Sequence, residues 1–210
     1  WARDFNEARA FGGRGSTQRS AEQTDAARFW EYSLPAIYHG VVRSAVQQQP
    51  RRSLLHNARL FATVAQAMDD ALIATFDAKY HYHFWRPVTA VRNADIDGND
   101  ATQRDASWAP LIDTPMHPEY PSAHSSLAAV VAVVLKADNA GAALPVLSTS
   151  SPTAKGALRK WTRLEDFVEE VADARVHAGI HYRSATEAGE ALGTRVGELA
   201  AARLLLAAPQ

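Results

Sequence analysis

Apolar residues recur at helical spacing in several stretches of this chain, whereas no stretch of useful length alternates as a β-strand would. The longest helical pattern follows Ser53, and its apolar face comprises Leu54, Ala58, Phe61, Ala65, Met68, Leu72 and Phe76. We expect a long helix whose end delivers the chain to Lys79. The whole pattern predicts an all-α fold, a helical bundle joined by long loops.

Start and stop signals divide the N-terminal part of the chain. Residues Phe11 to Arg19 are rich in Gly and polar groups, which predicts an irregular lead-in. Ser20 and Gln23 have the form of a capping box, so a helix should run from there through Trp30. Another helix is expected from Pro35 to Gln48, because a proline follows two residues later.

Two irregular segments flank an apolar helix in the middle of the chain. Positions 93 to 120 contain Gly, Pro, Asp and Asn, and so long a loop in a compact domain is often functional. Ser122 then suits the N-cap of a helix from Ala123 to Lys136. Positions 137 to 156 are again expected to form a loop.

An arginine stands on the apolar face of the next predicted helix. Thr162 and Glu165 predict a second capping box, and the helix places Leu164, Phe167, Val168, Val171 and Ala174 on one face. Arg175 shares that face, and a buried guanidinium needs a partner. The partner is either a bound anion or a carboxylate of Asp69, Asp70 or Asp77.

The last predicted helix, Thr186 to Leu206, has glycines at four-residue steps: Gly189, Gly193 and Gly197. Residues four apart lie on the same helical face. We therefore expect a neighbouring helix to approach this face closely.

Composition bounds the class of protein. The 210 residues are 47% hydrophobic and 21% charged, which predicts one domain over positions 1 to 210. A net charge of -1 gives no overall attraction for nucleic acid. The absence of cysteine excludes disulfides and thiolate sites, and the longest apolar run, Leu127 to Leu135, is too short to span a bilayer.

The chain begins at Trp1 and shows no signal peptide, so we expect a processed or truncated product. Its compartment stays open, with a secreted or periplasmic location favoured. A missing N-terminal helical half or a homo-oligomer is compatible with this expectation.

Three distant segments carry groups that bind an oxyanion: Lys79 to Arg86-Pro87, Pro121-Ser122-Ala123-His124, and Arg175 to Gly179 and His181. Ser122 lies at a helix start, where free N–H groups attract anions, and Gly179 permits the turn that brings Arg175 and His181 together. On one helix, Lys79 and Arg86 would share a face, but Pro87 favours an extended conformation at Arg86, at the helix end. Taken singly, the segments also read as surface cations, an N-cap with an incidental histidine, and a core ion pair.

These segments, in this order and spacing, resemble the signature of the vanadium-dependent haloperoxidases and the type 2 phosphatidic acid phosphatases. The amino-acid sequence from Ala78 to Arg92 and from Pro118 to Ser122 resembles that of the bacterial haloperoxidase-related branch. The resemblance implies that the chain corresponds to the C-terminal, active-site half of such a protein, and that its long loops are active-site loops.

The resemblance also implies a role for each site residue. Lys79, Arg86, Ser122, the Ala123 amide and Arg175 would hold vanadate, or phosphate in the same site. His181 would be the axial vanadium ligand and His124 the acid–base group, in a reaction of hydrogen peroxide with a halide. Bromide or iodide is favoured over chloride, because His117 and Phe76 stand where chloride-oxidising members tend to carry other aromatics.

Two alternatives remain open. One is an acid phosphatase that hydrolyses a phosphomonoester through a phosphohistidine at His181; the other is an oxyanion-binding helical protein without turnover. The second is motivated by Ala123, where the family has Gly, and by Ala185, where it often has an Asp that orients the axial histidine. Without that Asp, we expect Glu187, Ser184 or a backbone carbonyl to orient His181.

Overall fold

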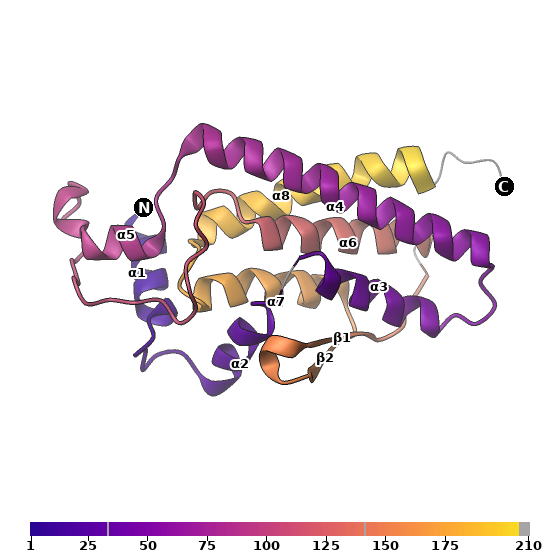
Figure 1. Ribbon diagram of the computed structural model, residues 1–210, viewed down its shortest axis with the longest axis horizontal. Coiled ribbons are helices and arrows are strands. Elements are labelled where there is room, and N and C mark those ends of the chain that lie inside the picture. Colours follow the sequence, from indigo (N-terminus) through magenta and orange to yellow (C-terminus); the bar gives the residue numbers. More distant parts are fainter. Residues whose placement is uncertain (33, 141, 206–210) are drawn as a thin grey trace.

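A computed structural model describes residues 1–32, 34–140 and 142–205, and it shows a bundle of helices with one small hairpin (Figure 1). The α-helices are α1 (Ala2–Gly12), α2 (Ala21–Phe29), α3 (Ala36–Gln47), α4 (Leu54–Tyr82), α5 (Pro87–Arg92), α6 (Ala123–Asp138), α7 (Leu164–His177) and α8 (Arg183–Ala200). Short helical turns are η1 (Ala94–Ile96), η2 (Pro152–Ala154) and η3 (Ala201–Leu205), and the strands are β1 (Leu147–Ser151) and β2 (Ala157–Trp161). The all-α prediction is confirmed as the dominant architecture.

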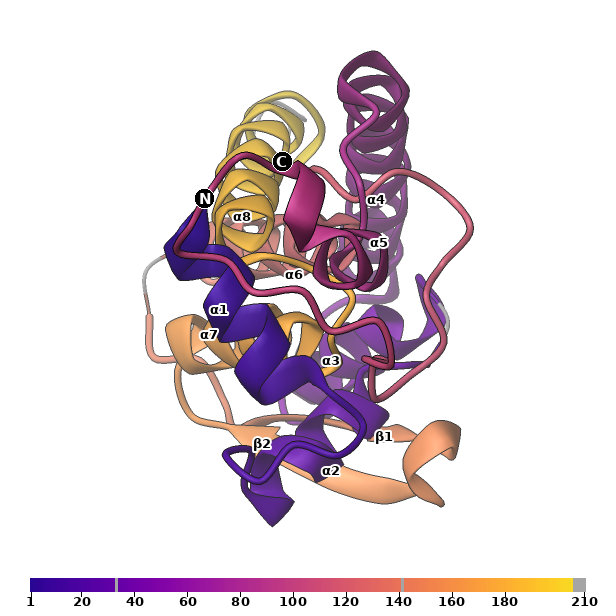
Figure 2. The same ribbon diagram turned by 90° about the vertical axis from the view of Figure 1, so that its left-hand side faces the viewer.

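Helix α6 forms the centre of the bundle. It contacts α3, α4, α7 and α8, and its residues 127 to 131 are all buried. A helix that is apolar on every side must be enclosed in this way. Seen along the bundle, α1 and α5 lie across one end, together with the loop that leads into α6 (Figure 2).

The glycines of α8 allow it to lie directly against α6. A Cβ atom on Gly189 would come within 2.4 Å of the Ser122 carbonyl oxygen, and one on Gly193 within 2.0 Å of the Ser126 carbonyl oxygen. At Gly197 the nearest atom would be the Val133 Cβ, at 3.0 Å. The predicted close approach is confirmed, and it sets how near the two helices lie to each other.

The predicted long helix is confirmed as α4, but its apolar positions are unevenly buried. The helix itself is present, with Ser53 as its N-cap, but Leu54 is 85% exposed and only Met68 of the predicted face is buried. The buried side is instead formed by Leu60, Thr63, Val64, Ala67, Met68, Ala71, Thr75 and Lys79. Small side chains occupy much of this face where α4 packs against α6 and α8.

Positions 147–161 were wrongly expected to contain no strand. β1 and β2 pair antiparallel, and β1 lies against α3, where Thr149 donates to the Ile37 carbonyl at 3.2 Å. The strand is rich in Ser and Thr and only five residues long, so its alternation was too weak to detect.

The second capping box was also wrong. Helix α7 begins at Leu164 with Arg163 as N-cap, and no side-chain cap is seen there in the described chain. The acidic first turn, Glu165 and Asp166, faces the positive end of the helix dipole and supplies a different stabilisation.

Other expected boundaries are confirmed within a few residues. The box of Ser20 and Gln23 is complete, and Ser122 caps α6. The last helix starts three residues early, at Arg183, and the predicted end at position 206 lies outside the described residues. Among the helices described, none has the length and apolarity needed to cross a membrane.

Candidate oxyanion-binding site

The first segment supplies two buried cations from different elements. Helix α4 ends at Tyr82, where His83 takes a left-handed conformation with φ of 48°, and Arg86 becomes the N-cap of α5. The extended conformation expected at Arg86 is confirmed, with ψ of 155°, so Lys79 and Arg86 do not belong to one continuous helix. Lys79 is fully buried and Arg86 is 6% exposed.

Both cations are bound to the loop that precedes α6. The Lys79 Nζ donates to the carbonyls of Pro118 and Glu119, at 2.9 and 2.8 Å. Arg86 donates from Nε to the His117 carbonyl at 3.0 Å and from NH1 to the Ile180 carbonyl at 2.7 Å. Burial, with Arg86 nearby, lowers the pKa of the Lys79 ammonium to about 7, and burial lowers that of Arg86 to about 10.

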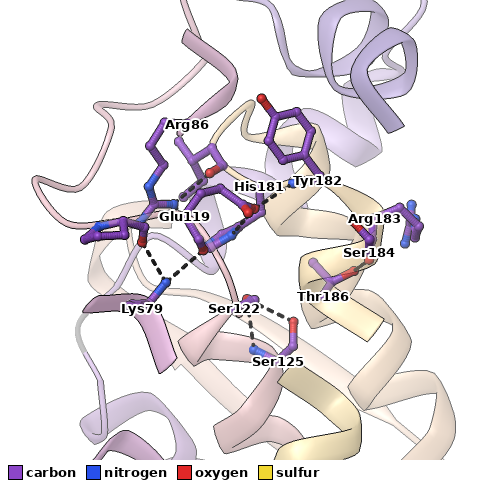
Figure 3. Close-up of polar contacts among 12 residues, drawn as sticks. Lys79, Arg86, Glu119, Ser122, Ser125, His181, Tyr182, Arg183, Ser184 and Thr186 are labelled. Carbon is purple, nitrogen blue, oxygen red and sulfur yellow. Dashed lines mark hydrogen bonds and ion pairs between the residues drawn. The ribbon is translucent and has the colours of Figure 1, made fainter. Parts of the chain in front are cut away.

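The second segment begins α6. The Ser122 amide donates to the Ala185 carbonyl at 2.9 Å, which joins α6 to the start of α8. The Ser122 hydroxyl accepts from the Ser125 amide and hydroxyl, at 3.4 and 3.1 Å, so its own proton can be donated elsewhere (Figure 3). The Ala123 amide lies in the first turn, where N–H groups lack an intrahelical acceptor.

Two buried nitrogen atoms in this region have no hydrogen-bond partner among the described residues: His124 Nε2 and Arg175 Nε. The Arg175 NH1 donates to the Trp30 carbonyl at 2.5 Å, and the side chain forms no ion pair with a carboxylate in the described parts of the chain. The alternative of an Asp69, Asp70 or Asp77 partner is therefore wrong. A buried guanidinium without a carboxylate leaves positive charge uncompensated.

His181 is reached through a sharp turn at Gly179, where φ is 77°. A Cβ atom at Gly179 would lie 2.3 Å from the Gly12 carbonyl oxygen, and one at Gly12 would lie 2.3 Å from the Gly179 Cα. The Leu111 amide donates to both the Gly12 and Ala178 carbonyls, at 2.9 and 3.1 Å. The turn that sets His181 is thus held by α1 and by the long loop.

The expected orienting group of His181 was wrong. Glu187 and Ser184 are exposed, and the contact is made by Glu119, whose Oε1 lies 2.7 Å from His181 Nδ1 (Figure 3). The other ring nitrogen, Nε2, lies 3.2 Å from Arg86 NH1. Glu119 could have been noticed as the acidic residue three positions before Ser122, but no periodicity marks it in a loop.

Electrostatics keep both imidazoles neutral. Burial lowers the pKa of His181 well below its ordinary value, and Arg86 and Lys79 add to that shift. Burial and Arg175 act in the same direction on the pKa of His124. A neutral imidazole can bond a metal or accept a proton, so this cationic surrounding favours the chemically useful form.

His117 also belongs to this region. Its Nδ1 lies 3.1 Å from Arg86 NH2, and its ring packs against Phe76 with centroids 5.0 Å apart. Burial, with Arg86 and Lys79, lowers the pKa of His117 to about 4. By contrast, His81 and His83 lie at the exposed end of α4, and the described residues contain no cluster of metal-ligating side chains.

The three sequence segments therefore meet at one end of the bundle. The residues predicted to bind or act on the oxyanion all belong to these segments: Lys79, Arg86, Ser122, Ala123, His124, Arg175 and His181. Contacts through the Glu119 segment link the first segment to His181, and the Ala185 carbonyl links Ser122 to the same region. Buried donors, a helix N-terminus and one carboxylate give an arrangement that suits a tetrahedral oxyanion such as vanadate or phosphate.

Comparison with known proteins gives concordant matches. Residues 59–207 match the family model described as VCPO second helical-bundle domain. A vanadium chloroperoxidase of Curvularia inaequalis is 32% identical over 141 residues, which are 55% of this chain and 22% of that protein.

Solved structures extend the similarity over nearly the whole chain. A bacterial vanadium-dependent iodoperoxidase superposes with a TM-score of 0.80 and 27% identity, over 96% of this chain and 49% of that one. A bacterial vanadium-dependent chloroperoxidase in its holo form shares the fold, with a TM-score of 0.74 and 21% identity over 95% and 46%. The chain spans about half the length of these solved structures, and its match covers 22% of the Curvularia inaequalis protein. By its match to the second helical-bundle domain over most of its length, the chain belongs to the vanadium haloperoxidase family.

Proposed function

We propose that this chain binds vanadate and oxidises halide with hydrogen peroxide, as a vanadate-dependent haloperoxidase. The observation that carries the proposal is the pair of unpartnered buried nitrogens, His124 Nε2 and Arg175 Nε, in an excess of positive charge. Such atoms cost free energy unless a ligand satisfies them. An oxyanion would satisfy both and would neutralise the charge.

We assign the binding role to five residues. Lys79, Arg86 and Arg175 supply charge, and the Ser122 hydroxyl and Ala123 amide supply donors at the positive end of α6. Lys79 and Arg86 already donate to loop carbonyls, which holds their side chains in place for this task. Ala123 is compatible with this role, because the anion contact is made by its backbone N–H.

The two histidines take separate roles in the proposal. His181 Nε2 would bond the vanadium, and His124 would accept and return a proton at Nε2. The chemistry that vanadate supplies when bound is that of a Lewis acid, which polarises hydrogen peroxide for attack by halide. Lys79 and Arg86, held by the loop carbonyls, would stabilise the negative charge that develops during the reaction.

Bromide or iodide is the proposed halide, rather than chloride. The support is the aromatic pair of His117 and Phe76 beside Arg86, together with the similarity to an iodoperoxidase. We further infer that positions 1 to 210 act as one domain, equivalent to the active-site half of a longer haloperoxidase.

The test is peroxide-dependent oxidation of iodide and bromination of a phenol-red-type dye, each with and without added orthovanadate. Activity should require vanadate and should be lost in His181→Ala but kept in Glu187→Gln, an exposed control on α8. Equilibrium binding of vanadate is measured in parallel. Hydrolysis of an aryl phosphate that vanadate inhibits would favour the phosphohistidine phosphatase instead, and vanadate binding without turnover of either kind would favour the oxyanion-binding protein.

A further inference from the structure

Glu119 connects the first and third segments of the site and stands two residues before the second. Its amide donates to the Phe84 carbonyl at 2.9 Å, and its own carbonyl accepts from Lys79 Nζ at 2.8 Å. Its Oε1 lies 2.7 Å from His181 Nδ1 and accepts from the Tyr182 amide at 2.9 Å. Figure 3 shows the Glu119 side chain directed at His181 while its backbone receives the Lys79 ammonium.

The neighbours of His181 specify which ring nitrogen carries the proton. Arg86 NH1, 3.2 Å from Nε2, can only donate a hydrogen bond, so Nε2 must offer its lone pair. In a neutral imidazole the proton is then on Nδ1. The Nδ1–H group of His181 then donates a hydrogen bond to Oε1 of Glu119.

The resemblance would place the orienting carboxylate four residues after His181, but in this structure Glu119 makes the contact. Position 185 is alanine, it is fully buried, and its carbonyl is already used by the Ser122 amide. Within the described chain, Glu119 is the acidic residue that pairs with His181. Its side chain is 1% exposed, so water competes little for this hydrogen bond.

We infer that Glu119 is the positioning residue of His181, fixing the ring with its proton on Nδ1 and its Nε2 lone pair toward Arg86, one of the residues assigned to the oxyanion. The inference about geometry stands by itself, and its purpose in vanadate binding rests on the proposed function. A second hydrogen bond from the Tyr182 amide keeps the acceptor oxygen in place.

The first measurement needs no vanadate. Nitrogen-15 NMR of the imidazoles, with His181 assigned through His181→Gln, should report the Nδ1-protonated tautomer in the unmodified chain. Glu119→Leu should give a mixture of tautomers, whereas Glu119→Gln keeps an acceptor oxygen and should preserve the Nδ1–H form. A wild-type chain with the His181 proton on Nε2 overturns the inference, whichever variants fold.

The second measurement is vanadate affinity. Glu119→Leu should bind vanadate about 10- to 100-fold more weakly, and Glu119→Gln should lose less. Glu187→Gln, at an exposed position on α8, should change nothing. Equal affinity in Glu119→Leu and wild type contradicts the positioning role, whereas a wild-type chain that binds no vanadate defeats the proposed function and leaves the tautomer result intact.

Discussion

The α6–α8 contact and the site beside it are packed in opposite ways. Along the contact, glycines of α8 meet backbone carbonyls of α6 so closely that no side chain fits between them. At the N-terminal end of α6 His124 Nε2, and in the last turn of α7 Arg175 Nε, are buried without a partner among the described residues. Gly189 packs on Ser122 itself, so the tightly packed region holds the unsatisfied one in position. On α6, the close contact at Ser122 and the unpartnered ring nitrogen of His124 thus lie only two residues apart.

The largest effect should come from removing the uncompensated cation of the site. Arg175→Met should reduce halide oxidation about 10²- to 10³-fold, because a fixed donor to the oxyanion is lost. The free energy of unfolding should stay equal or rise, because a buried guanidinium without a carboxylate is replaced by an apolar chain.

Turnover and urea denaturation measure the two quantities, and Arg195→Met, exposed on α8, is the control. Full activity combined with a large loss of stability in Arg175→Met would mean that this arginine is structural and that the contrast between the two regions is mistaken.

The packed region should respond in the opposite sense. Gly193→Ala puts a Cβ atom 2.0 Å from the Ser126 carbonyl oxygen, so α8 must move away from α6. We expect a loss of about 2–3 kcal/mol in the free energy of unfolding. Chemical denaturation measures it, with Gly15→Ala as the control, since no atom lies within 4 Å of a Cβ built there. Equal stability of the two variants would show that the contact is loose.

The border between the regions can be tested by pH. Asp4, 7% exposed, accepts from the Ser184 amide at 3.0 Å at the start of α8. Burial by itself raises the pKa of this carboxyl, but hydrogen bonds from Ser184 and Arg3 outweigh it and the pKa is lowered. Its stabilisation is therefore present above the ordinary carboxyl pKa and is lost as pH falls through the lowered value.

Asp4→Ala should cost about 1–2 kcal/mol near neutral pH and less below about pH 4. Denaturation of both proteins at several pH values gives the difference, and exposed Asp25→Ala serves as control. A difference that grows on acidification has the wrong sign for this mechanism.

The smallest effect is expected far from both regions. Ser20→Ala removes the side-chain half of a complete capping box on α2 and should cost about 1 kcal/mol without changing turnover. Thermal unfolding measures it, compared with Thr17→Ala at an exposed position. A change in catalytic rate in the folded Ser20→Ala protein would indicate that α2 acts on the site.

Fold features with strong local causes could be predicted from the sequence. The capping serines, the glycine spacing of α8 and the apolar face of α7 each depend on neighbours within one or two turns. The buried face of α4 could not, because small residues such as Ala67 and Ala71 are chosen by the shape of α6 and α8. The hairpin was missed for a similar reason, since β1 is stabilised by its contact with α3.

For the site, the sequence predicted the three cationic segments and the burial of Arg175 on an apolar helix face. It did not predict Glu119, because the pairing with His181 spans 62 positions and depends on how the loop folds over Arg86. Nor could it predict that Arg175 bonds the Trp30 carbonyl instead of an aspartate. The long-range partners of charged groups are decided by tertiary packing, which local patterns do not encode.

The contact between Gly12 and Gly179 has a consequence for how this chain can change over time. Each glycine occupies the space that a side chain on the other would need, so a substitution at either position is blocked until the backbone separates. Relatives that keep a histidine at the position of His181 and this first helix should therefore retain the two glycines together or lose them together. The first helix is in this sense inherited with the turn that carries His181, although the two glycines lie far apart in the sequence.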